Sequence, residues 1–424
     1  MKITNNGLCV IDLPGEKNYA VVSPGRIAYG LNASSKDLFE LCAKEKRLLN
    51  RVRKHGHNTI IRSSSVGIMP TFDCNLRCVY CYARGGDSKE FISRDNYQIA
   101  ISQAWKFGGS KNHLDLYLVG GGEPLLDLVL VSEMVNFAKS CYKSVNLRVV
   151  TNGVFDEKTL KWICDNKADV RVSYDGVMHD KQRPFPDGSS SRNIVRMNIK
   201  ELATIGLNPT VQCIVSNEGV NTICQTIDDV LNLRVKRIKI EPVLSTAVSR
   251  SGKAMEPNPV EYADRLLKAV EYVASLKIEF KIDTGYFTEP STGFYCGISD
   301  PNKTVTPEGL ITACVEVSRQ NDPYAETVIY GKIINGNICF DSSKRNLLRS
   351  LHFNNQQGGC IDCNLRLICQ GGCPMANIWR SGFPYKKSGF TCAVEKFLIP
   401  KLLLGIAENP EIGKVVLDTG AKMC

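Results

Sequence analysis

The chain has 424 residues, of which 43% are hydrophobic and 23% are charged, a composition that excludes fibrous, collagenous and wholly disordered proteins. At roughly 150 residues per domain, this length predicts two or three domains, each able to bury its own core. The apolar stretch 397–407 is shorter than the roughly 18 residues of a membrane span, so no membrane segment is expected. The N-terminus lacks the apolar region of a secretory signal, which predicts a cytoplasmic protein.

The chain contains eighteen cysteines, an unusual number for such a protein. In a reducing compartment, clustered cysteines are more often metal ligands than disulfide partners, so we expect metal sites. The net charge of +10 is modest for a chain of 46.9 kDa, and it suits an acidic partner such as an acidic peptide or RNA.

The first 65 residues are expected to form a hairpin followed by a helix. Two short strands, 18–23 and 26–30, flank the turn Pro24-Gly25, and apolar residues at helical spacing predict a helix over 35–54. The other face of that helix is basic and carries Lys44, Lys46, Arg47, Arg51, Arg53 and Lys54. A solvated face is the simpler interpretation, and docking of an acidic peptide or nucleic acid is the alternative.

From about residue 66 to 290, short β-branched segments alternate with longer helical patterns. The expected strands are 66–71, 114–119, 146–151, 170–174, 210–215 and 237–241. The expected helices lie near 94–106, 128–141, 157–165, 192–204, 219–232 and 259–275. Six successive strand–helix units predict an α/β fold with a parallel sheet and outer helices, either a TIM-like barrel or a doubly wound sheet.

After residue 290 the helical periodicity fades and cysteines become dense. The sequence therefore predicts four regions, which are an N-terminal hairpin plus helix at 1–65, the α/β core at 66–290, a small cysteine-rich domain at 291–395 and a helical tail at 396–424.

The first cysteine cluster follows the first expected strand. Cys74, Cys78 and Cys81 lie within eight residues, and thiolates of this kind suit both zinc and iron–sulfur clusters. A closed zinc site needs four ligands, whereas only three are available locally. Three ligands on a cubane would leave one iron open to bind something else. The carboxyl end of a barrel strand is also where such folds place their chemistry.

The spacing Cys-x3-Cys-x2-Cys, with the aromatic Tyr80 before the last cysteine, resembles that of the radical S-adenosylmethionine (SAM) enzymes. The resemblance implies a partial (β/α)6 TIM-like barrel and a [4Fe–4S] cluster on Cys74, Cys78 and Cys81, with SAM chelated to the fourth iron. It also implies that one electron from the cluster cleaves SAM to methionine and a 5′-deoxyadenosyl radical, which abstracts a substrate hydrogen.

Polar and glycine-rich segments end the next three expected strands. Gly120 to Pro124 reads Gly-Gly-Gly-Glu-Pro, where glycines let the backbone approach a ligand closely and Glu123 offers an acceptor; an ordinary turn is the alternative. This segment resembles the family's GGEP element, which contacts the SAM amino group. The segments 151–153 and 173–176 resemble those that line the SAM site, and Arg183 matches an arginine near the SAM carboxylate. The implied cofactor contacts are Tyr80, Gly121, Gly122, Glu123, Asn152, Ser173, Asp175 and Arg183.

The second set of cysteines resembles the SPASM extension of radical SAM enzymes, which holds two auxiliary [4Fe–4S] clusters. Carried over by position, one cluster would use Cys360, Cys363, Cys369 and Cys392. The other would use Cys296, Cys314 and Cys373, with a fourth ligand that the match does not fix. Cys339, on an expected strand at 337–340, is a candidate for that ligand. Two zinc ions are the alternative for this domain.

SPASM-type enzymes mostly act on peptides or proteins, so the resemblance implies a cytoplasmic maturase of a ribosomally made peptide. The expected reaction is a thioether or carbon–carbon cross-link or a related oxidation, with an electron donor such as flavodoxin or ferredoxin. Many such maturases carry a winged-helix domain that binds the leader of the peptide. The first 65 residues are either a shortened version of it or a barrel cap.

Two alternatives stay open at the level of sequence. Oxidation of a protein cysteine or serine to formylglycine is one, although sulfatase maturases typically have an aspartate where this chain has Val315. The following residue, Glu316, is a candidate general base, with a structural role as its alternative. The other alternative is a zinc-binding nucleic-acid module, but the basic residues form no stripe with interleaved aromatics.

Overall fold

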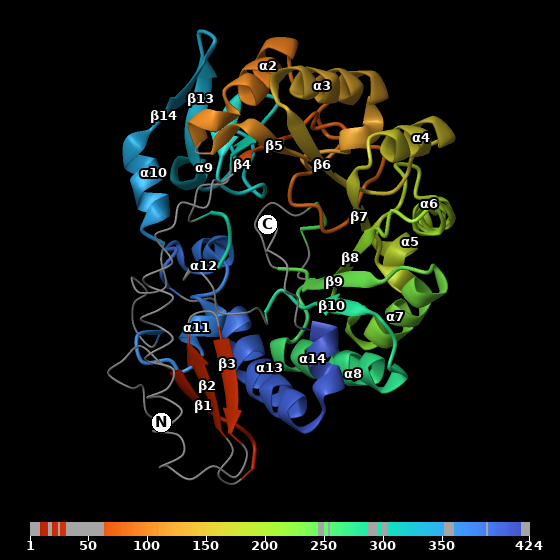
Figure 1. Ribbon diagram of the computed structural model, residues 1–424, viewed down its shortest axis with the longest axis vertical. Coiled ribbons are helices and arrows are strands. Elements are labelled where there is room, and N and C mark those ends of the chain that lie inside the picture. The colour runs from red at the N-terminus through yellow and green to blue at the C-terminus, as the bar shows by residue number, and fades with distance from the viewer. Residues whose placement is uncertain are drawn as a thin grey trace. The chain divides into compact units, whose positions relative to one another are not determined.

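The computed structural model describes residues 9–15, 19–23, 26–30, 63–107, 109–244, 250–252, 255–286, 295–298, 303–351, 360–386 and 389–416 (Figure 1). The chain divides into two compact units. The barrel unit comprises residues 61–256 and 297–349, and the second unit comprises 1–60, 257–296 and 350–424. The helix expected over 35–54 lies outside the described residues.

Six parallel strands form the centre of the barrel unit. They are β4 (Ser63–Ile68), β5 (Ser110–Leu118), β6 (Ser144–Thr151), β7 (Asp169–Ser173), β8 (Thr210–Val215) and β9 (Arg237–Pro242). Each strand pairs with the strand before it in the chain. A doubly wound sheet would reverse its strand order at a switch point, so this consecutive order decides for the barrel-type fold.

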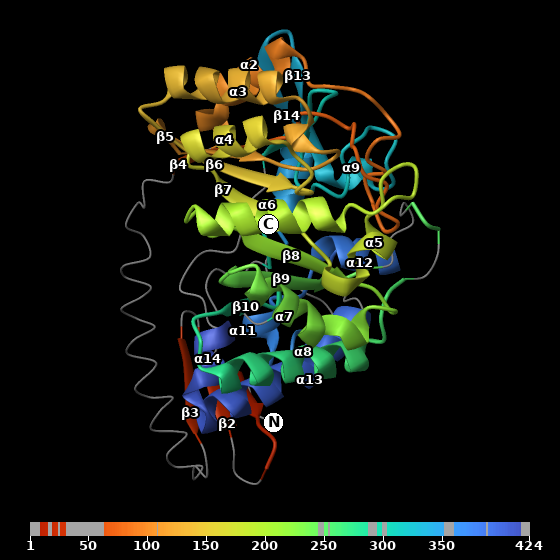
Figure 2. The ribbon, with the colours of Figure 1, turned by 90° about the vertical axis from the view of Figure 1, so that its right-hand side faces the viewer.

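Helices cover the outer side of this sheet (Figures 1 and 2). They are α2 (Arg94–Ser102), α3 (Leu128–Cys141), α4 (Glu157–Asp165), α5 (His179–Gln182), α6 (Arg192–Thr204) and α7 (Ile223–Asn232). Three of them begin where a polar side chain accepts a hydrogen bond from a free backbone amide of the first turn, at Ser93, Asp127 and Asp156. The expected strands and helices of this region are confirmed to within a few residues.

Four further strands extend the sheet from the free edge of β4. β11 (Thr304–Val305) runs parallel to β4, and β12 (Leu310–Thr312), β13 (Ile329–Ile334) and β14 (Asn337–Phe340) continue it antiparallel. The short helices α9 (Ala325–Val328) and α10 (Ser342–Arg349) belong to the same segment. Part of the cysteine-rich region is therefore built onto the barrel sheet.

The side chain of Gln103 closes the last strand of this extension. Its Nε2 donates to the carbonyl of Gly336 at 2.9 Å, and its Oε1 accepts from the amide of Ile338 at 3.2 Å. Gln103 thus satisfies one donor of the β14 backbone and one acceptor of the turn just before it, as a neighbouring strand would.

The second unit combines a small sheet with helices. The strands β1 (Cys9–Asp12), β2 (Tyr19–Ser23) and β3 (Arg26–Gly30) form an antiparallel meander, which confirms the expected hairpin and adds a strand before it. Its other elements are α8 (Pro259–Leu276), β10 (Lys281–Asp283), α11 (Arg366–Cys369), α12 (Pro374–Ser381), α13 (Gly389–Glu408) and α14 (Pro410–Val416). Among the described residues, no helix is both long and apolar enough to cross a membrane.

Candidate active site

The loop that follows β4 carries the first three cysteines. The amide of Gly86 donates to the carbonyl of Phe72 at 2.8 Å and so closes the loop. Inside it, the Arg77 guanidinium donates to the carbonyls of Cys74, at 2.7 Å, and Gly86, at 3.0 Å. We call residues 72–86 the cluster loop. Its own backbone and Arg77 hold it in one shape.

Nitrogen donors contact two thiols of the cluster loop, those of Cys74 and Cys81. The Leu76 amide and Asn152 Nδ2 lie 3.5 and 3.7 Å from the Cys74 sulfur, and the Gly85 amide lies 3.4 Å from the Cys81 sulfur. Such contacts stabilise thiolate ligands and tune iron–sulfur clusters. Burial, with the nearby Glu123 carboxylate, raises the pKa of the Cys74 thiol to about 12. Buried thiolates therefore need a bound cation, and this donor set fits an iron–sulfur cluster.

The glycines at the end of β5 seat the cluster loop. The Gly122 amide donates to the carbonyl of Thr71 at 2.9 Å, and the Glu123 amide donates to the carbonyl of Asp73 at 2.8 Å. A Cβ atom on Gly122 would collide with the Asp73 carbonyl, whereas one on Gly120 would have no atom closer than 3.8 Å. The glycines thus let the cluster loop approach the sheet. The expected contact of Gly121 and Gly122 with SAM stays a prediction.

Glu123 joins the ends of β5 and β6. Its carboxylate accepts from Thr151 Oγ1 and from the Asn152 amide, each at 2.7 Å, and from the Leu125 amide at 3.1 Å. The side chain is only 2% exposed, and this burial raises the pKa of Glu123 to about 7 although the three hydrogen bonds lower it. Because Asn152 also contacts Cys74, Glu123 positions a donor to the cluster loop.

A buried ion pair supports the aromatic residue of the cysteine motif. Arg183 Nε lies 2.8 Å from Asp175 Oδ2, and the Tyr80 hydroxyl donates to the same oxygen at 2.6 Å. The guanidinium carbon of Arg183 also lies 5.2 Å from the centre of the Tyr80 ring. Burial on its own would raise the pKa of Asp175, but Arg183 outweighs it and holds that pKa below its usual range. The structure therefore joins three expected SAM contacts into one group, while Ser173, at the end of β7, is partly exposed.

Two arginines that no sequence motif indicates also hold the cluster loop. Arg250 donates from Nη2 to the carbonyl of Gly85 at 2.8 Å, and its own amide donates to the carbonyl of Cys81 at 3.2 Å. Arg319 donates from Nη1 to the carbonyl of Ala83 at 3.0 Å. A single arginine outside a motif gives no periodic or spacing signal, so sequence reasoning had no means of finding either residue.

Arg319 connects the cluster loop to the turn that contains Cys314 and Glu316. Thr312 Oγ1 donates to the carbonyls of Cys314, at 2.9 Å, and Val317, at 2.7 Å, which fixes this turn. Burial strongly raises the pKa of Tyr82, and the nearby charges of Glu316, Cys81 and Cys314 raise it further. The barrel unit thus brings Cys314 and Glu316 to the vicinity of the cluster loop.

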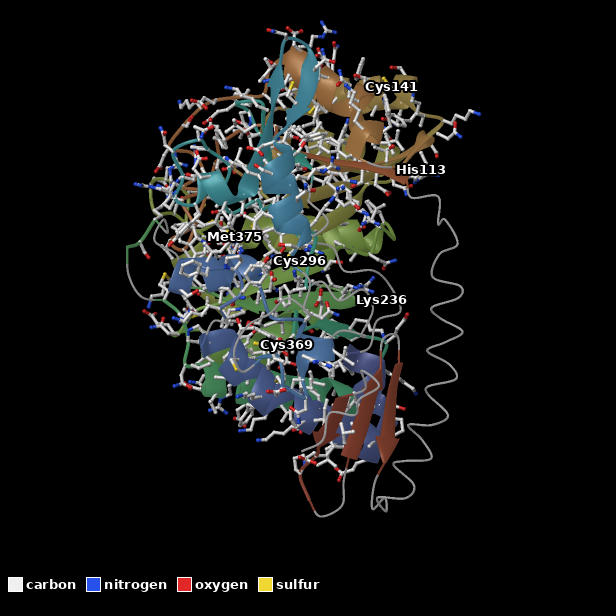
Figure 3. All side chains as sticks on the ribbon, turned by 90° about the vertical axis from the view of Figure 1, so that its left-hand side faces the viewer. His113, Cys141, Lys236, Cys296, Cys369 and Met375 are labelled. Atoms are coloured by element: carbon white, nitrogen blue, oxygen red, sulfur yellow. The ribbon has the colours of Figure 1, made fainter. Side chains whose placement is uncertain are left out.

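The remaining expected cluster cysteines lie in the second unit, where Cys296 and Cys369 are marked in Figure 3. The three residues between Cys369 and Cys373 all have a positive φ, from 52° to 87°. A Cβ atom on Gly372 would lie 3.0 Å from Thr391, so this turn packs against the start of α13, next to Cys392. Burial raises the pKa of Tyr295, as do the charges of the nearby Cys373 and Cys296. Cysteines that are distant in sequence are thus gathered here.

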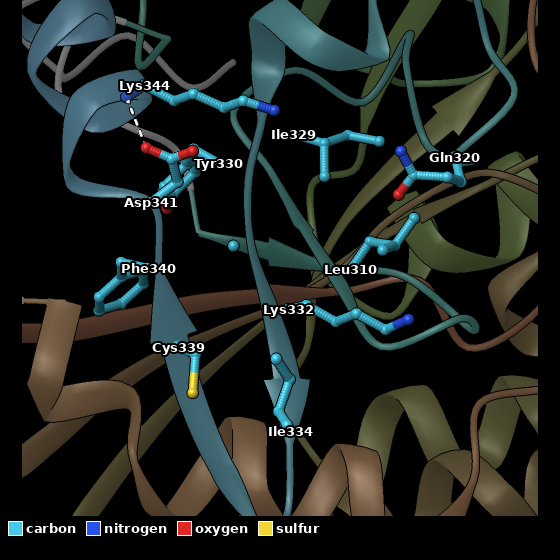
Figure 4. Close-up of a pocket in the computed structure, with 11 residues that line it drawn as sticks. Leu310, Gln320, Ile329, Tyr330, Lys332, Ile334, Cys339, Phe340, Asp341 and Lys344 are labelled. Atoms are coloured by element: carbon cyan, nitrogen blue, oxygen red, sulfur yellow. Dashed lines mark hydrogen bonds between the residues drawn. The ribbon is translucent and has the colours of Figure 1, made fainter.

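Cys339 belongs to a different part of the barrel unit. It is exposed on β14 and lines a groove of about 380 Å³ over β12 to β14, with Lys332, Ile334 and Lys344 among its neighbours (Figure 4). None of the other expected site residues lines this groove. Across the described side chains, no three His, Cys, Asp or Glu residues are grouped closely enough to hold a single metal ion.

Comparison with known proteins gives relatives over part of the chain and over most of the chain. No protein-family model matches. A probable GTP 3′,8-cyclase of Methanococcus maripaludis is 27% identical over 194 residues, which cover 43% of this chain and 61% of the relative. The mycofactocin maturase MftC of Mycolicibacterium smegmatis is 22% identical over 336 residues, 74% of this chain and 78% of the relative. The match to the cyclase thus spans less than two thirds of its length.

Solved structures share the fold. The structure of anSMEcpe with bound AdoMet and Cp18Cys peptide matches with a TM-score of 0.68 and 16% identity, over 82% of this chain and 99% of that chain. Streptococcus suis SuiB bound to its precursor peptide SuiA matches with a TM-score of 0.56 and 14% identity, over 86% and 83% of the two chains. The cysteine motif after β4, the barrel fold and these relatives favour an enzyme over a zinc-binding nucleic-acid module. In its cysteine motif, its fold and its relatives, the chain is similar to the radical SAM enzymes.

Proposed function

We propose that the protein is a maturase that modifies a ribosomally made peptide by forming a thioether or carbon–carbon cross-link or by a related oxidation. Mycofactocin maturase shares most of its length with this chain, and two proteins of the same fold have been solved with a bound peptide. These relatives support a peptide or protein as the substrate. The bond that forms is the finer part of the proposal.

One observation carries this function. The turn with Cys314 and Glu316 is tied to the cluster loop through Arg319, whose Nη1 lies 3.0 Å from the Ala83 carbonyl. An enzyme that only cleaves SAM has no use for a second cysteine site beside the first. A reaction that forms a new bond after hydrogen abstraction must lose one more electron, and an adjoining cluster would accept it.

The residues would divide the work as follows. Cys74, Cys78 and Cys81 would hold a [4Fe–4S] cluster that, together with SAM, supplies the 5′-deoxyadenosyl radical. Asn152 and the Gly85 amide donate to the sulfurs, and the group of Asp175, Arg183 and Tyr80 supports the motif from the end of β7. The auxiliary clusters on the SPASM cysteines, and Glu316 as the base that accepts a substrate proton, complete the proposal.

The experiment uses anaerobically reconstituted enzyme with SAM, an electron donor such as flavodoxin, and small peptides encoded beside the gene. A cross-linked product loses hydrogen mass and resists sequencing across the bond, which mass spectrometry detects. An aldehyde at a cysteine or serine would instead favour the formylglycine reaction. Cleavage of SAM with every candidate peptide and protein left unmodified would contradict both.

A further inference from the structure

Strands β7, β8 and β9 have one apolar face and one polar face. Their alternate residues are buried, and Val170 and Val172, for example, are no more than 1% exposed. A Cβ atom on Gly153 would touch both Val172 and Val195 of α6, so this apolar face packs against the outer helices. The opposite face therefore points to the barrel interior, because neighbouring residues of a strand point to opposite sides. Its polar residues are Asp169, which is exposed, and Arg171, Ser173, Thr210, Gln212, Arg237, Lys239 and Glu241, which are partly exposed.

The strand register places these side chains in rows. Arg171 pairs with Thr210, which pairs in turn with Arg237. One step further, Ser173 pairs with Gln212, and Gln212 pairs with Lys239. Neighbours in one row stand side by side on the same face of a sheet. The interior of the barrel thus presents an ordered polar surface rather than the packed apolar core of many TIM barrels.

This interior surface is cationic. On β7, β8 and β9 it has the three cations Arg171, Arg237 and Lys239 and the two carboxylates Asp169 and Glu241. Lys239 Nζ and Gln212 Nε2 engage the two oxygens of Glu241, at 2.8 and 2.7 Å. Burial on its own would raise the pKa of Glu241, but the charges of Lys239 and Arg171 hold it below its usual range. Glu241 is engaged by Lys239 and Gln212, and Asp169 lies beside Arg148, so a further anion would be favoured next to Arg171.

Arg171 has an unmet donor on this surface. Its Nε is buried and has no hydrogen-bond partner among the described residues. A buried donor without an acceptor is costly, and a guanidinium binds a carboxylate best because its fork matches two oxygens. By contrast Arg148, on the same face of β6, lies 3.5 Å from Asp169 and donates to the Tyr117 hydroxyl. Arg171 is therefore the residue of this surface that would stabilise a bound anion most.

We propose that Arg171, with Lys239 beside it, binds a carboxylate of the substrate peptide inside the barrel. This proposal rests on the proposed function, because it takes a peptide as the ligand. The carboxylate belongs either to an acidic side chain or to the C-terminus. The carboxylate of SAM is a competing source, but the expected SAM contacts lie at or after the carboxyl ends of the strands, and on β7 the nearest of them, Ser173, is two residues beyond Arg171.

The test measures binding by calorimetry to the iron-loaded full chain saturated with SAM. Three acetylated tripeptides serve as probes: Gly-Glu-Gly amide carries a side-chain carboxylate, Gly-Gly-Gly acid carries a terminal one, and Gly-Gln-Gly amide carries none. We expect at least one acidic probe to bind about tenfold or more tightly than the neutral probe, which corresponds to about 1.4 kcal/mol. The tighter acidic probe identifies the source.

Variants assign the effect to Arg171. R171Q should abolish the preference, R171K should keep part of it, and R148Q should leave it unchanged. If R171Q does not load iron, the affinities of the parent enzyme for the three probes still test the carboxylate preference. Equal affinity of the SAM-saturated enzyme for acidic and neutral probes would overturn the proposal.

Binding of the probes requires no turnover, so the two proposals can fail separately. A carboxylate preference without any modified peptide would leave the subsite and remove the maturase function. A modified peptide without a carboxylate preference would support the maturase function and contradict the subsite.

Discussion

The guanidinium carbon of Arg319 lies 3.9 Å from the centre of the Phe72 ring. Phe72 begins the cluster loop, so Arg319 contacts this loop through its first residue and through the carbonyl of Ala83. The backbone amide of Arg319 donates to Asp322 Oδ2 at 2.8 Å, which fixes the arginine from its own side. Two segments that both carry expected cluster ligands are therefore held together by one side chain.

Replacing Arg319 should separate SAM cleavage from product formation. We expect R319M to lose the ring contact and a charged hydrogen bond, each contributing on the order of 1 kcal/mol, so that the Cys314 turn is held less firmly. The yield of product per 5′-deoxyadenosine should fall several-fold. R345M is the matched control, because Arg345 lies over Phe340 of the same segment, at 4.6 Å. An unchanged yield in R319M would show that Arg319 has no role in this coupling.

Iron content tests the number of clusters. Anaerobically reconstituted enzyme should hold about twelve irons per chain if three [4Fe–4S] clusters are present. The triple variant with Cys74, Cys78 and Cys81 changed to Ala should hold about eight, since the auxiliary ligands remain. Acid-labile sulfide should follow the same ratio. Zinc in place of iron would contradict the radical mechanism.

Gly122 should be needed for cluster assembly. G122A places a methyl group against the Asp73 carbonyl, so the cluster loop cannot lie against β5 and about four irons should be lost. G120A is the control two residues away, where the nearest atom is 3.8 Å from the added carbon. Normal iron content in G122A would mean that the loop can shift without losing its ligands.

His179 should make folding sensitive to acid. The ring is fully buried, accepts from the Asp175 amide at 3.3 Å through Nδ1, and lies 3.0 Å from Ser191 through Nε2. Burial lowers the pKa of His179 from 6.5 to about 4, so the folded state disfavours the charged ring. Stability from this source is present above pH 6.5 and is lost as the pH falls towards 4, by up to about 3 kcal/mol.

Denaturant unfolding between pH 7.5 and pH 5 measures this loss. H179Q should be less stable at pH 7.5 but should show a flatter decline with acidification. H113Q is the control, because His113 is partly exposed near the start of β5. A decline of equal steepness in H179Q and the parent would assign the acid sensitivity to other groups.

The barrel elements could be predicted because their signals are local. The expected bounds of β8, α3, α4 and α6 agree with the structure, since their apolar periodicity and caps lie within the segment itself. The attachment of β11 to β4 could not be predicted, because it joins residues more than 230 positions apart and is only two residues long. The cysteines were recognisable by their spacing.

The supports of the site were not predictable in the same way. Asp175 and Arg183 were expected to contact SAM, and their hydrogen bonds to each other and to Tyr80 depend on how three segments meet in space. A binding role for Arg171 could not be predicted from the sequence. In a five-residue strand, a charged residue at this position is typical of the ordinary alternation between polar and apolar residues.

The Gln103 amide that caps β14 has a consequence for behaviour at high concentration. A bare terminal strand offers its peptide groups to any other extended chain, and such edge-to-edge pairing is a common origin of fibres and precipitates. With Gly336 and Ile338 already bonded to Gln103, a foreign strand would have to displace this side chain before it could pair. For the proposed peptide-modifying function, this side chain would hinder uptake of an extended peptide along the wrong edge of the sheet.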